Sequence, residues 1–220
     1  LHVTDLVALD PVTGGELWRT EAKGKWGSPV TVSLEGGDVI LTPNGDVFRA
    51  SDGHQLASKI GNLEYGTPVV IDRIAYFIEK KASAVQLPHS IDEPFETNRL
   101  WGVRIKGSRH YASPAIHDGL IYTISREEHY TLLDAKTGEL LHEEDMQLGG
   151  RKPNSAYPSV TLAGDNVFVS SENGTTVVLE TGREHKEVTR NHLEGFRCSP
   201  VFIDDKVYIR GFKHIYCIGE

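Results

Sequence analysis

Cysteine is scarce in this sequence. Among 220 residues only Cys198 and Cys217 occur, both close to the C-terminal end. A disulfide between them would indicate an oxidising compartment. The strand pattern described below places Cys198 at the start of the first strand and Cys217 near the end of the third strand of one antiparallel sheet. Because alternate strands of a meander run in the same direction, the thiols fall at opposite ends of that sheet. We therefore expect two buried free thiols rather than a disulfide.

Long apolar runs and an excess of basic residues are missing as well. No segment approaches the roughly 18–20 apolar residues that a membrane helix needs. The chain has 31 acidic and 23 basic residues, a formal net charge of −8, without long runs of one sign. This balance argues against nucleic-acid binding, which favours a basic face. No signal peptide is evident, but the first residue is Leu1 rather than Met, so that absence excludes nothing.

The chain does contain a sequence motif that occurs five times. Each copy has a Ser or Thr, usually followed by Pro, then an apolar strand, a turn and a second apolar strand. The copies are marked by Ser28-Pro29, Thr67-Pro68, Ser113-Pro114, Ser159-Val160 and Ser199-Pro200, spaced 39, 46, 46 and 40 residues apart. A period of about 40–45 residues with several short strands is typical of the blades of a β-propeller. The apolar fraction of 39% is sufficient for a sizeable core.

The third copy shows the pattern most clearly. It predicts strands over 113–117 and 120–124, joined by a hairpin turn at Asp118-Gly119. A third strand follows over 130–134, and a turn over 136–138 leads into a fourth strand over 139–143. The turn requires Gly138 where φ is positive, and the Asp134 side chain is expected to accept hydrogen bonds from the turn amides. Four strands and three hairpins make one blade.

The other copies fit the same frame, with one departure. Residues 88–98 (PHSIDEPFETN) insert a polar, proline-containing segment before a final strand at 99–105, which we interpret as a surface loop on a blade. The fold is thus predicted to be a single all-β domain, a β-propeller with four complete four-stranded antiparallel blades and two partial ones. The expected blades are 1–25 (partial), 26–64, 65–110, 111–156, 157–196 and 197–220 (partial).

Three segments carry a resemblance to a known family. Val7 to Trp18 (VALDPVTGGELW) closely resembles the ALDxxTGxxxW signature of pyrroloquinoline-quinone (PQQ) repeat propellers. Residues 132–141 (LLDAKTGELL) are similar, but His142 stands where Trp is usual. Residues 207–219 resemble the C-terminal blade of exported PQQ-binding-like bacterial propellers. The resemblance implies a periplasmic or extracellular protein in which Trp18 and Trp101 pack between neighbouring blades.

The number of strands suggests a larger ring. The N-terminal stretch supplies a third and a fourth strand, and the C-terminal stretch supplies a first, second and third. Joining them would duplicate the third strand, so the simplest expectation is the C-terminal part of a seven- or eight-bladed propeller. A five-bladed ring with one spare strand is the alternative. An open fragment would expose an unpaired blade face, which usually requires a partner or self-association.

The candidate site follows from aligning the five copies. Propeller ligands usually bind at one end of the central channel, where the loops leading into the innermost strands converge. The residues two places before the repeated Ser or Thr are Trp26, Tyr65, Tyr111, Tyr157 and Arg197. With neighbouring Arg109 they suit a flat, anionic or sugar-like ligand. The alternative is a plug of the channel or a wedge between blades. Positive charge is expected on the same loops from Lys25, Arg109, His110, Arg151 and Lys152.

Other clusters point less clearly to a site. The loops between second and third strands are expected to reach the same rim, and one holds Glu127-Glu128-His129. Consecutive hairpin residues rarely converge on one ion, so we expect no metal there. Residues 142–144 (HEE) lie in an outer strand and are interpreted as a solvated edge. Asn173-Gly174-Thr175 matches a glycosylation sequon, but Asn-Gly also favours a hairpin turn, which is our prediction.

Enzymatic activity is the less favoured hypothesis. Quinoprotein dehydrogenases, as the resemblance implies, use adjacent cysteines beside the quinone, a Trp floor and Ca²⁺ held by Glu, Asn and Asp. The sequence has no adjacent cysteine pair and no other catalytic motif. We therefore predict a non-catalytic exported module, without metal or cofactor, that binds a small molecule or a protein at its axial face. The alternatives are a PQQ- and calcium-dependent alcohol or sugar dehydrogenase, and an envelope assembly scaffold resembling outer-membrane lipoprotein propellers.

Overall fold

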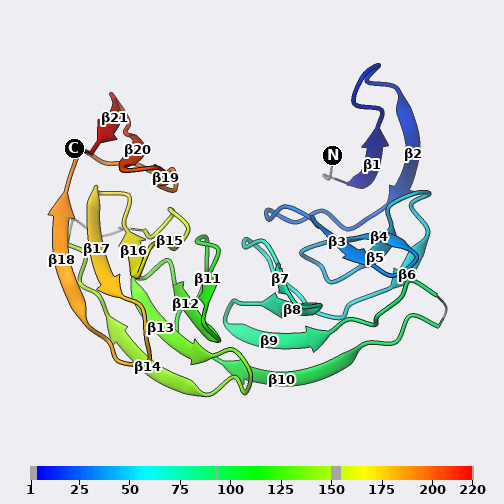
Figure 1. Cartoon of the computed structure of the whole chain (residues 1–220), viewed down its shortest axis with the longest axis horizontal. Coiled ribbons are helices and arrows are strands. Elements are labelled where there is room, and N and C mark those ends of the chain that lie inside the picture. Colours follow the sequence, from blue (N-terminus) through cyan, green and yellow to red (C-terminus); the bar gives the residue numbers. More distant parts are fainter. Residues whose placement is uncertain (1–3, 93, 150–154, 220) are drawn as a thin grey trace. The chain divides into compact units, whose positions relative to one another are not determined.

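The computed structural model describes residues 4–92, 94–149 and 155–219. The chain divides into two compact units, Leu1–Val103 and Arg104–Glu220. Antiparallel strands account for all the regular structure of the described residues, and the strand labels locate each sheet in Figure 1. No helix among those residues is long and apolar enough to cross a membrane.

The first unit contains one two-stranded and two four-stranded sheets. The two-stranded sheet pairs β1 (Asp5–Leu9) with β2 (Glu16–Glu21). The next sheet follows chain order, with β3 (Val30–Leu34), β4 (Gly37–Leu41), β5 (Val47–Arg49) and β6 (Gln55–Ala57). The last contains β7 (Val69–Ile71), β8 (Ile74–Phe77), β9 (Lys81–Gln86) and β10 (Asn98–Arg104), whose final residue opens the second unit.

The second unit contains two four-stranded sheets and one three-stranded sheet. The first consists of β11 (Ala115–His117), β12 (Leu120–Ile124), β13 (His129–Asp134) and β14 (Leu140–Asp145). The second consists of β15 (Thr161–Ala163), β16 (Asn166–Ser170), β17 (Thr175–Glu180) and β18 (Glu187–His192). The third consists of β19 (Val201–Ile203), β20 (Lys206–Arg210) and β21 (Ile215–Ile218). The prediction of four complete and two partial blades is confirmed.

Local turn chemistry explains the hairpins. At the β11–β12 turn Asp118 and Gly119 both have positive φ, 47° and 73°, as a tight two-residue hairpin requires. At the turn before β14 the Asp134 carboxylate accepts hydrogen bonds from the backbone amides of Lys136 and Thr137, each at 3.0 Å. Gly174 has a φ of +98°, and Asn173 accepts a hydrogen bond from the Thr175 amide, so the turn prediction is confirmed.

The repeated Ser or Thr links consecutive blades. Its side-chain oxygen accepts a hydrogen bond from the backbone amide of the equivalent residue one blade earlier. In the first unit Ser28 donates to Thr67 at 3.1 Å; in the second, Ser113 donates to Ser159 at 3.2 Å and Ser159 donates to Ser199 at 3.0 Å. The residue that marks each copy in the sequence is therefore also an inter-blade contact.

Apolar side chains fill the space between neighbouring sheets of each unit. One buried cluster joins residues of β4, β5, β8 and β9 in the first unit, and another joins β12, β13, β16 and β17 in the second. Trp18 packs between blades as predicted, because its indole N–H donates to the carbonyl of Ala50 at 3.0 Å. Trp101 is 9% exposed and lies 6.2 Å from Tyr76 of its own blade, between ring centroids.

The inserted segment 88–98 is more than a surface loop. The amide of Glu35 donates to the carbonyl of His89 at 2.8 Å, and the amide of Ile91 donates back to Glu35 at 3.0 Å. Phe95 is 9% exposed and belongs to the buried cluster of the first unit, with Ile91 packed against it. Because the segment is mostly polar, the sequence did not indicate the apolar contacts of Phe95 and Ile91. Through these contacts the segment packs against the preceding blade.

The cysteines are free, as expected, but the expectation that both are buried is wrong. Cys198 is half-buried, and its sulfur exchanges hydrogen bonds with the backbone of Arg210 at 3.2 and 3.3 Å. Cys217, in β21, is exposed. This sheet also exposes several apolar side chains, among them Val201, Ile203 and Ile215 at 53, 54 and 78%.

Candidate functional site

Backbone hydrogen bonds hold the loops that carry the candidate site in the second unit. We call 105–114, the described residues 146–149 and 155–160, and 193–200 the connecting loops, since each leads toward the first strand of a sheet. The backbone amide of Arg126, in the β12–β13 turn, donates to the backbone carbonyl of Arg109 at 2.7 Å. The backbone amide of Glu172, in the β16–β17 turn, donates to the carbonyl of Ser155 at 3.0 Å. The carbonyl of Glu172 accepts a hydrogen bond from the amide of Phe196 at 3.1 Å. Connecting loops and hairpin turns therefore alternate along one rim, as the sequence predicted for these turns.

Adjacent residues of the connecting loops differ in burial. The residues three places before the repeated Ser are buried: His110, Ala156 and Phe196 are at most 1% exposed. The following residues, Tyr111, Tyr157 and Arg197, are half-buried or exposed. Three equivalent positions of consecutive blades thus present their side chains outward.

These three outward side chains touch one another. The rings of Tyr111 and Tyr157 stack with centroids 4.7 Å apart and planes inclined by 10°. The guanidinium carbon of Arg197 lies 4.3 Å from the centroid of the Tyr157 ring. At the other end, Arg109 donates to the hydroxyl of Tyr111 at 3.2 Å. The structure therefore brings four of the six predicted site residues into one row, which we call the Tyr–Arg row (Arg109, Tyr111, Tyr157 and Arg197).

Glu172 completes this row and was not among the predicted site residues. Its carboxylate pairs with Arg197 at 2.8 Å and is 19% exposed. The hydrogen bond from Arg197 to this carboxylate raises the pKa of the guanidinium above its ordinary value. Glu172 lies in one of the turns that the sequence placed at the rim, but nothing in the sequence indicated which of those turn residues would meet Arg197.

Trp26 and Tyr65 belong to the first unit. The amide of Trp26 donates to the carbonyl of Glu64 at 3.0 Å, and its side chain is 81% exposed. The amide of Tyr65 donates to the carboxylate of Glu79 at 2.8 Å, which also accepts from the amides of Glu64 and Gly66. Because the two units are not positioned relative to one another, an arc that includes all six residues stays a prediction.

The predicted positive charge of these loops is reduced by pairing and burial. Lys25 forms an ion pair with Glu64, and its side chain is only 8% exposed. His110 is 1% exposed, and burial lowers its pKa to about 4, although the nearby charge of Glu127 opposes that shift. A neutral His110 adds no charge at pH 7. Arg151 and Lys152 lie outside the described residues.

The hairpin residues 127–129 do not converge on one point. Glu127 accepts hydrogen bonds from the amide and the hydroxyl of Ser108. The buried carboxylate of Glu128 instead accepts from the amide of Leu148 at 3.1 Å and from the hydroxyl of Ser171 at 2.8 Å. His129 is the first residue of β13. The two carboxylates therefore stabilise different loops and hold no common ligand position.

The family model described as "Outer membrane protein assembly factor BamB", a PQQ-repeat family, matches residues 2–218. The chain belongs to this family. The predicted resemblance to PQQ-repeat propellers and the predicted all-β propeller fold are thereby confirmed. A search of curated proteins gave no match.

Two solved structures are similar to this chain to different degrees. The crystal structure of BamB from Moraxella catarrhalis matches with a TM-score of 0.72 and 17% sequence identity, over 99% of this chain and 68% of that chain. A europium-containing methanol dehydrogenase matches with a TM-score of 0.45 and 14% identity, over 59% of this chain and 24% of that chain. The first match supports the propeller fold of the BamB family member described here.

The described residues do not fit the calcium site of a quinoprotein. Ca²⁺ takes six to eight oxygen ligands. Among the described residues, the one close group of three His, Cys, Asp or Glu side chains is His142, Glu144 and His185, which offers two imidazoles. Cys198 and Cys217 are separate free thiols rather than an adjacent pair. We derive no quinone-dependent step for this BamB family member.

Proposed function

We propose that this chain is a non-catalytic protein-binding module of the bacterial cell envelope, and that its partner binds at the Tyr–Arg row. The proposal rests on one observation: three consecutive blades present Tyr111, Tyr157 and Arg197 at equivalent positions and in mutual contact. Membership of a family described as outer-membrane protein assembly factors supports a role in envelope assembly and an exported location.

The chemistry of the row favours a protein over a flat small molecule. Tyr and Arg are enriched among the residues that dominate protein–protein binding energy, because they combine apolar area with polar ends. The Tyr157 ring is already engaged by Tyr111 and by Arg197. A planar ligand would have to separate this stack before it could lie against the ring, whereas a protein surface can use the exposed edges and the Arg109 and Arg197 side chains.

The test is capture of a partner from the envelope fraction of the source cells, with identification by mass spectrometry. Tyr111→Ala combined with Arg197→Ala should weaken capture at least about tenfold, as expected for loss of a binding hot spot. Tyr216→Ala combined with Arg19→Ala is the matched control, since these residues lie in β21 and β2. This control should bind as the unchanged protein does.

Two results would overturn the proposal. If the double variant and the unchanged protein captured the partner equally, the Tyr–Arg row would not be part of the interface. A small molecule retained by the purified protein in native mass spectrometry, and lost in the double variant, would assign the row to that ligand instead. Circular dichroism of both double variants confirms that folding is intact.

A further inference from the structure

One blade carries histidine at the position where the repeat signature has tryptophan. In β2, Trp18 follows Thr13 by five residues and packs against the next blade, where its indole donates to Ala50. In β14, His142 follows Thr137 by five residues and occupies the same place in the repeat. Where β2 has a large apolar side chain, β14 thus has an imidazole, and the neighbouring blade provides its partner.

That partner is His185, in the turn between β17 and β18. The turn is anchored to the preceding blade by two contacts: Gly182 donates its amide hydrogen to the hydroxyl of Tyr122 at 2.9 Å, and Arg183 pairs with Asp134 at 2.8 Å. These contacts place the His185 ring parallel to the His142 ring, with centroids 4.5 Å apart and planes inclined by 13°. The pairing therefore depends on the contact between two blades rather than on one strand.

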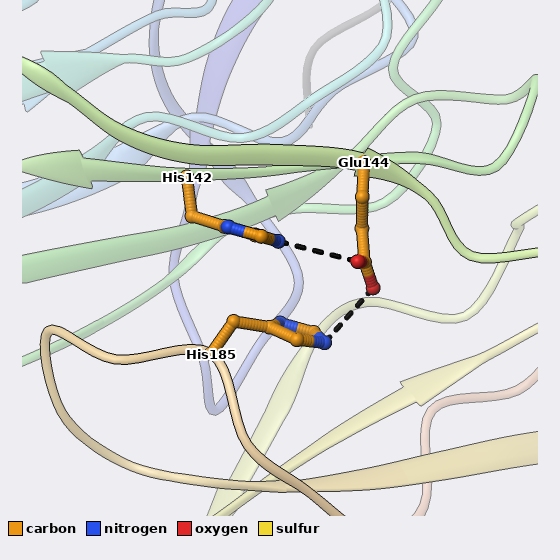
Figure 2. Close-up of side chains that lie close together, drawn as sticks. All are labelled: His142, Glu144 and His185. Atoms are coloured by element: carbon orange, nitrogen blue, oxygen red, sulfur yellow. Dashed lines mark ion pairs between the residues drawn. The ribbon is translucent and has the colours of Figure 1, made fainter.

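Glu144 joins the two rings. His142 and Glu144 are two residues apart in β14, so both side chains lie on the same face of the strand. The carboxylate oxygens of Glu144 lie 3.3 Å from Nε2 of His142 and 2.8 Å from Nε2 of His185. Figure 2 shows both imidazoles directed at this one carboxylate, His142 from the same strand as Glu144 and His185 from a loop of the neighbouring blade. The sequence-based interpretation of 142–144 as a solvated edge is wrong, because this face of β14 packs against the next blade.

The three side chains are only partly accessible to solvent. The His185 side chain is 14% exposed, and those of His142 and Glu144 are 32 and 36% exposed. The ring of Tyr130, itself 1% exposed, lies 5.5 Å from the His185 ring and 6.3 Å from the His142 ring. Nδ1 of His185 is buried without a hydrogen-bond partner, and Nε2 of His142 is buried with no hydrogen bond, its carboxylate contact being the 3.3 Å ion pair with Glu144. Buried imidazole nitrogens without a hydrogen bond cost free energy unless a ligand or a rearrangement of the rings satisfies them.

We propose that His142, Glu144 and His185 bind one divalent first-row transition-metal ion, of which Zn²⁺ is the reference case. One ligand atom from each residue lies within 4.8 Å of the other two. Two imidazoles and a carboxylate are a ligand set that Zn²⁺, Ni²⁺ and Cu²⁺ favour over Mg²⁺ and Ca²⁺. Binding requires the stacked rings to tilt so that both lone pairs meet at the ion, and leaves one position for water.

The first experiment measures zinc binding to chelator-treated protein by isothermal titration calorimetry. To exclude the two free thiols as ligands, the protein carries Cys198→Ser and Cys217→Ser. We expect one equivalent of Zn²⁺ per chain and a higher melting temperature with zinc, since an ion that bridges two blades stabilises the folded state. Mg²⁺ and Ca²⁺ should give neither effect. Absence of binding at zinc concentrations well above that of the protein would overturn the proposal.

Variants then locate the ion. His142→Gln and His185→Gln should each weaken zinc binding at least about tenfold. His214→Gln is the matched control, because His214 also lies beside a carboxylate, that of Glu194 at 3.2 Å, but has no second imidazole in its cluster. Zinc affinity unchanged by both His142→Gln and His185→Gln would contradict the site.

A third variant separates metal binding from folding. His142→Trp restores the residue that the repeat signature has at this position, and it should keep the protein folded while abolishing the zinc-dependent rise in melting temperature. In the protein without histidine substitutions, NMR measures the imidazole ¹⁵N chemical shifts. On addition of zinc, the shifts of His142 and His185 should change and those of His214 should stay constant. A shift at His214 alone would overturn the assignment.

Discussion

The backbone amide of Ser159 donates a hydrogen bond to the side-chain oxygen of Ser199 at 3.0 Å, and so links two consecutive blades. The same bond joins Ser113 to Ser159 and Ser28 to Thr67. Each of these amides lies just before the first strand of its blade, so the bond connects the segments that lead into neighbouring first strands. A hydroxyl at this place in the repeat therefore links one blade to the next within each unit.

Replacing Ser199 by Ala should destabilise the protein through loss of that acceptor. The Ser159 amide would be left without its partner, at a cost of about 1 kcal/mol in the free energy of unfolding. Urea unfolding followed by tryptophan fluorescence measures this change. Ser33→Ala, at an exposed position of β3, is the control and should stay within about 0.5 kcal/mol of the unchanged protein. Equal stability of the two variants would contradict an energetic role for the inter-blade bond.

Two glycines of equal backbone conformation allow the packing of Trp18 to be measured. Gly14 and Gly53 both have a φ of +72°, and each closes the last turn of its blade. A Cβ at Gly53 would lie 2.6 Å from the Trp18 ring, whereas a Cβ at Gly14 would meet nothing within 4 Å. Both alanine variants carry the cost of positive φ, about 1–2 kcal/mol.

Only Gly53→Ala should also displace the indole. We expect it to cost about 1–3 kcal/mol more than Gly14→Ala in the free energy of unfolding, because extra volume in a packed interface forces its neighbours to shift. The emission maximum of tryptophan fluorescence should move in Gly53→Ala and stay unchanged in Gly14→Ala. The same unfolding cost in both variants would indicate that Trp18 does not pack tightly against this turn.

Local chemistry made much of the fold predictable from the sequence. The Asp118-Gly119 turn and the hydrogen bonds of Asp134 depend on residues within one hairpin, and both were predicted. The row of Tyr111, Tyr157 and Arg197 followed from aligning the repeats, because equivalent positions of adjacent blades face the same way.

Contacts between blades were not predictable in the same way. His185 meets His142 only because the β17–β18 turn is anchored to Tyr122 and Asp134 of the neighbouring blade. From the sequence, Lys25 and His110 were expected to carry surface charge. In the structure Lys25 is paired with Glu64, and burial lowers the pKa of His110 so that it is neutral at pH 7. Such features depend on the distance between sheets, which the repeat pattern does not contain.

Addition of PQQ and Ca²⁺ should not turn this protein into a dehydrogenase. The close three-residue group of the described chain contains two imidazoles, which Ca²⁺ does not favour, and Cys198 and Cys217 are not adjacent. With a panel of alcohols and sugars, dye reduction should stay at the level of PQQ and Ca²⁺ without protein. A purified quinoprotein dehydrogenase serves as the positive control. Substrate-dependent turnover by this protein would reject the proposed non-catalytic role.

His110 should make the protein sensitive to acid. It is 1% exposed, both ring nitrogens lack a hydrogen-bond partner, and burial lowers its pKa from 6.5 to about 4. Between these two pKa values the unfolded chain binds a proton at His110 that the folded chain does not, so stability falls as pH falls from about 6.5 to about 4. Over the whole window this difference corresponds to about 3 kcal/mol.

His110→Leu removes the group that titrates and keeps the buried position filled. Between pH 7 and pH 5 the unchanged protein should therefore lose about 1–2 kcal/mol more of its unfolding free energy than His110→Leu does. Urea unfolding at several pH values measures both slopes, and His54→Leu, at an exposed position, is the control and should follow the unchanged protein. Parallel slopes for the unchanged protein and His110→Leu would mean that the buried imidazole can be protonated in the folded state without cost.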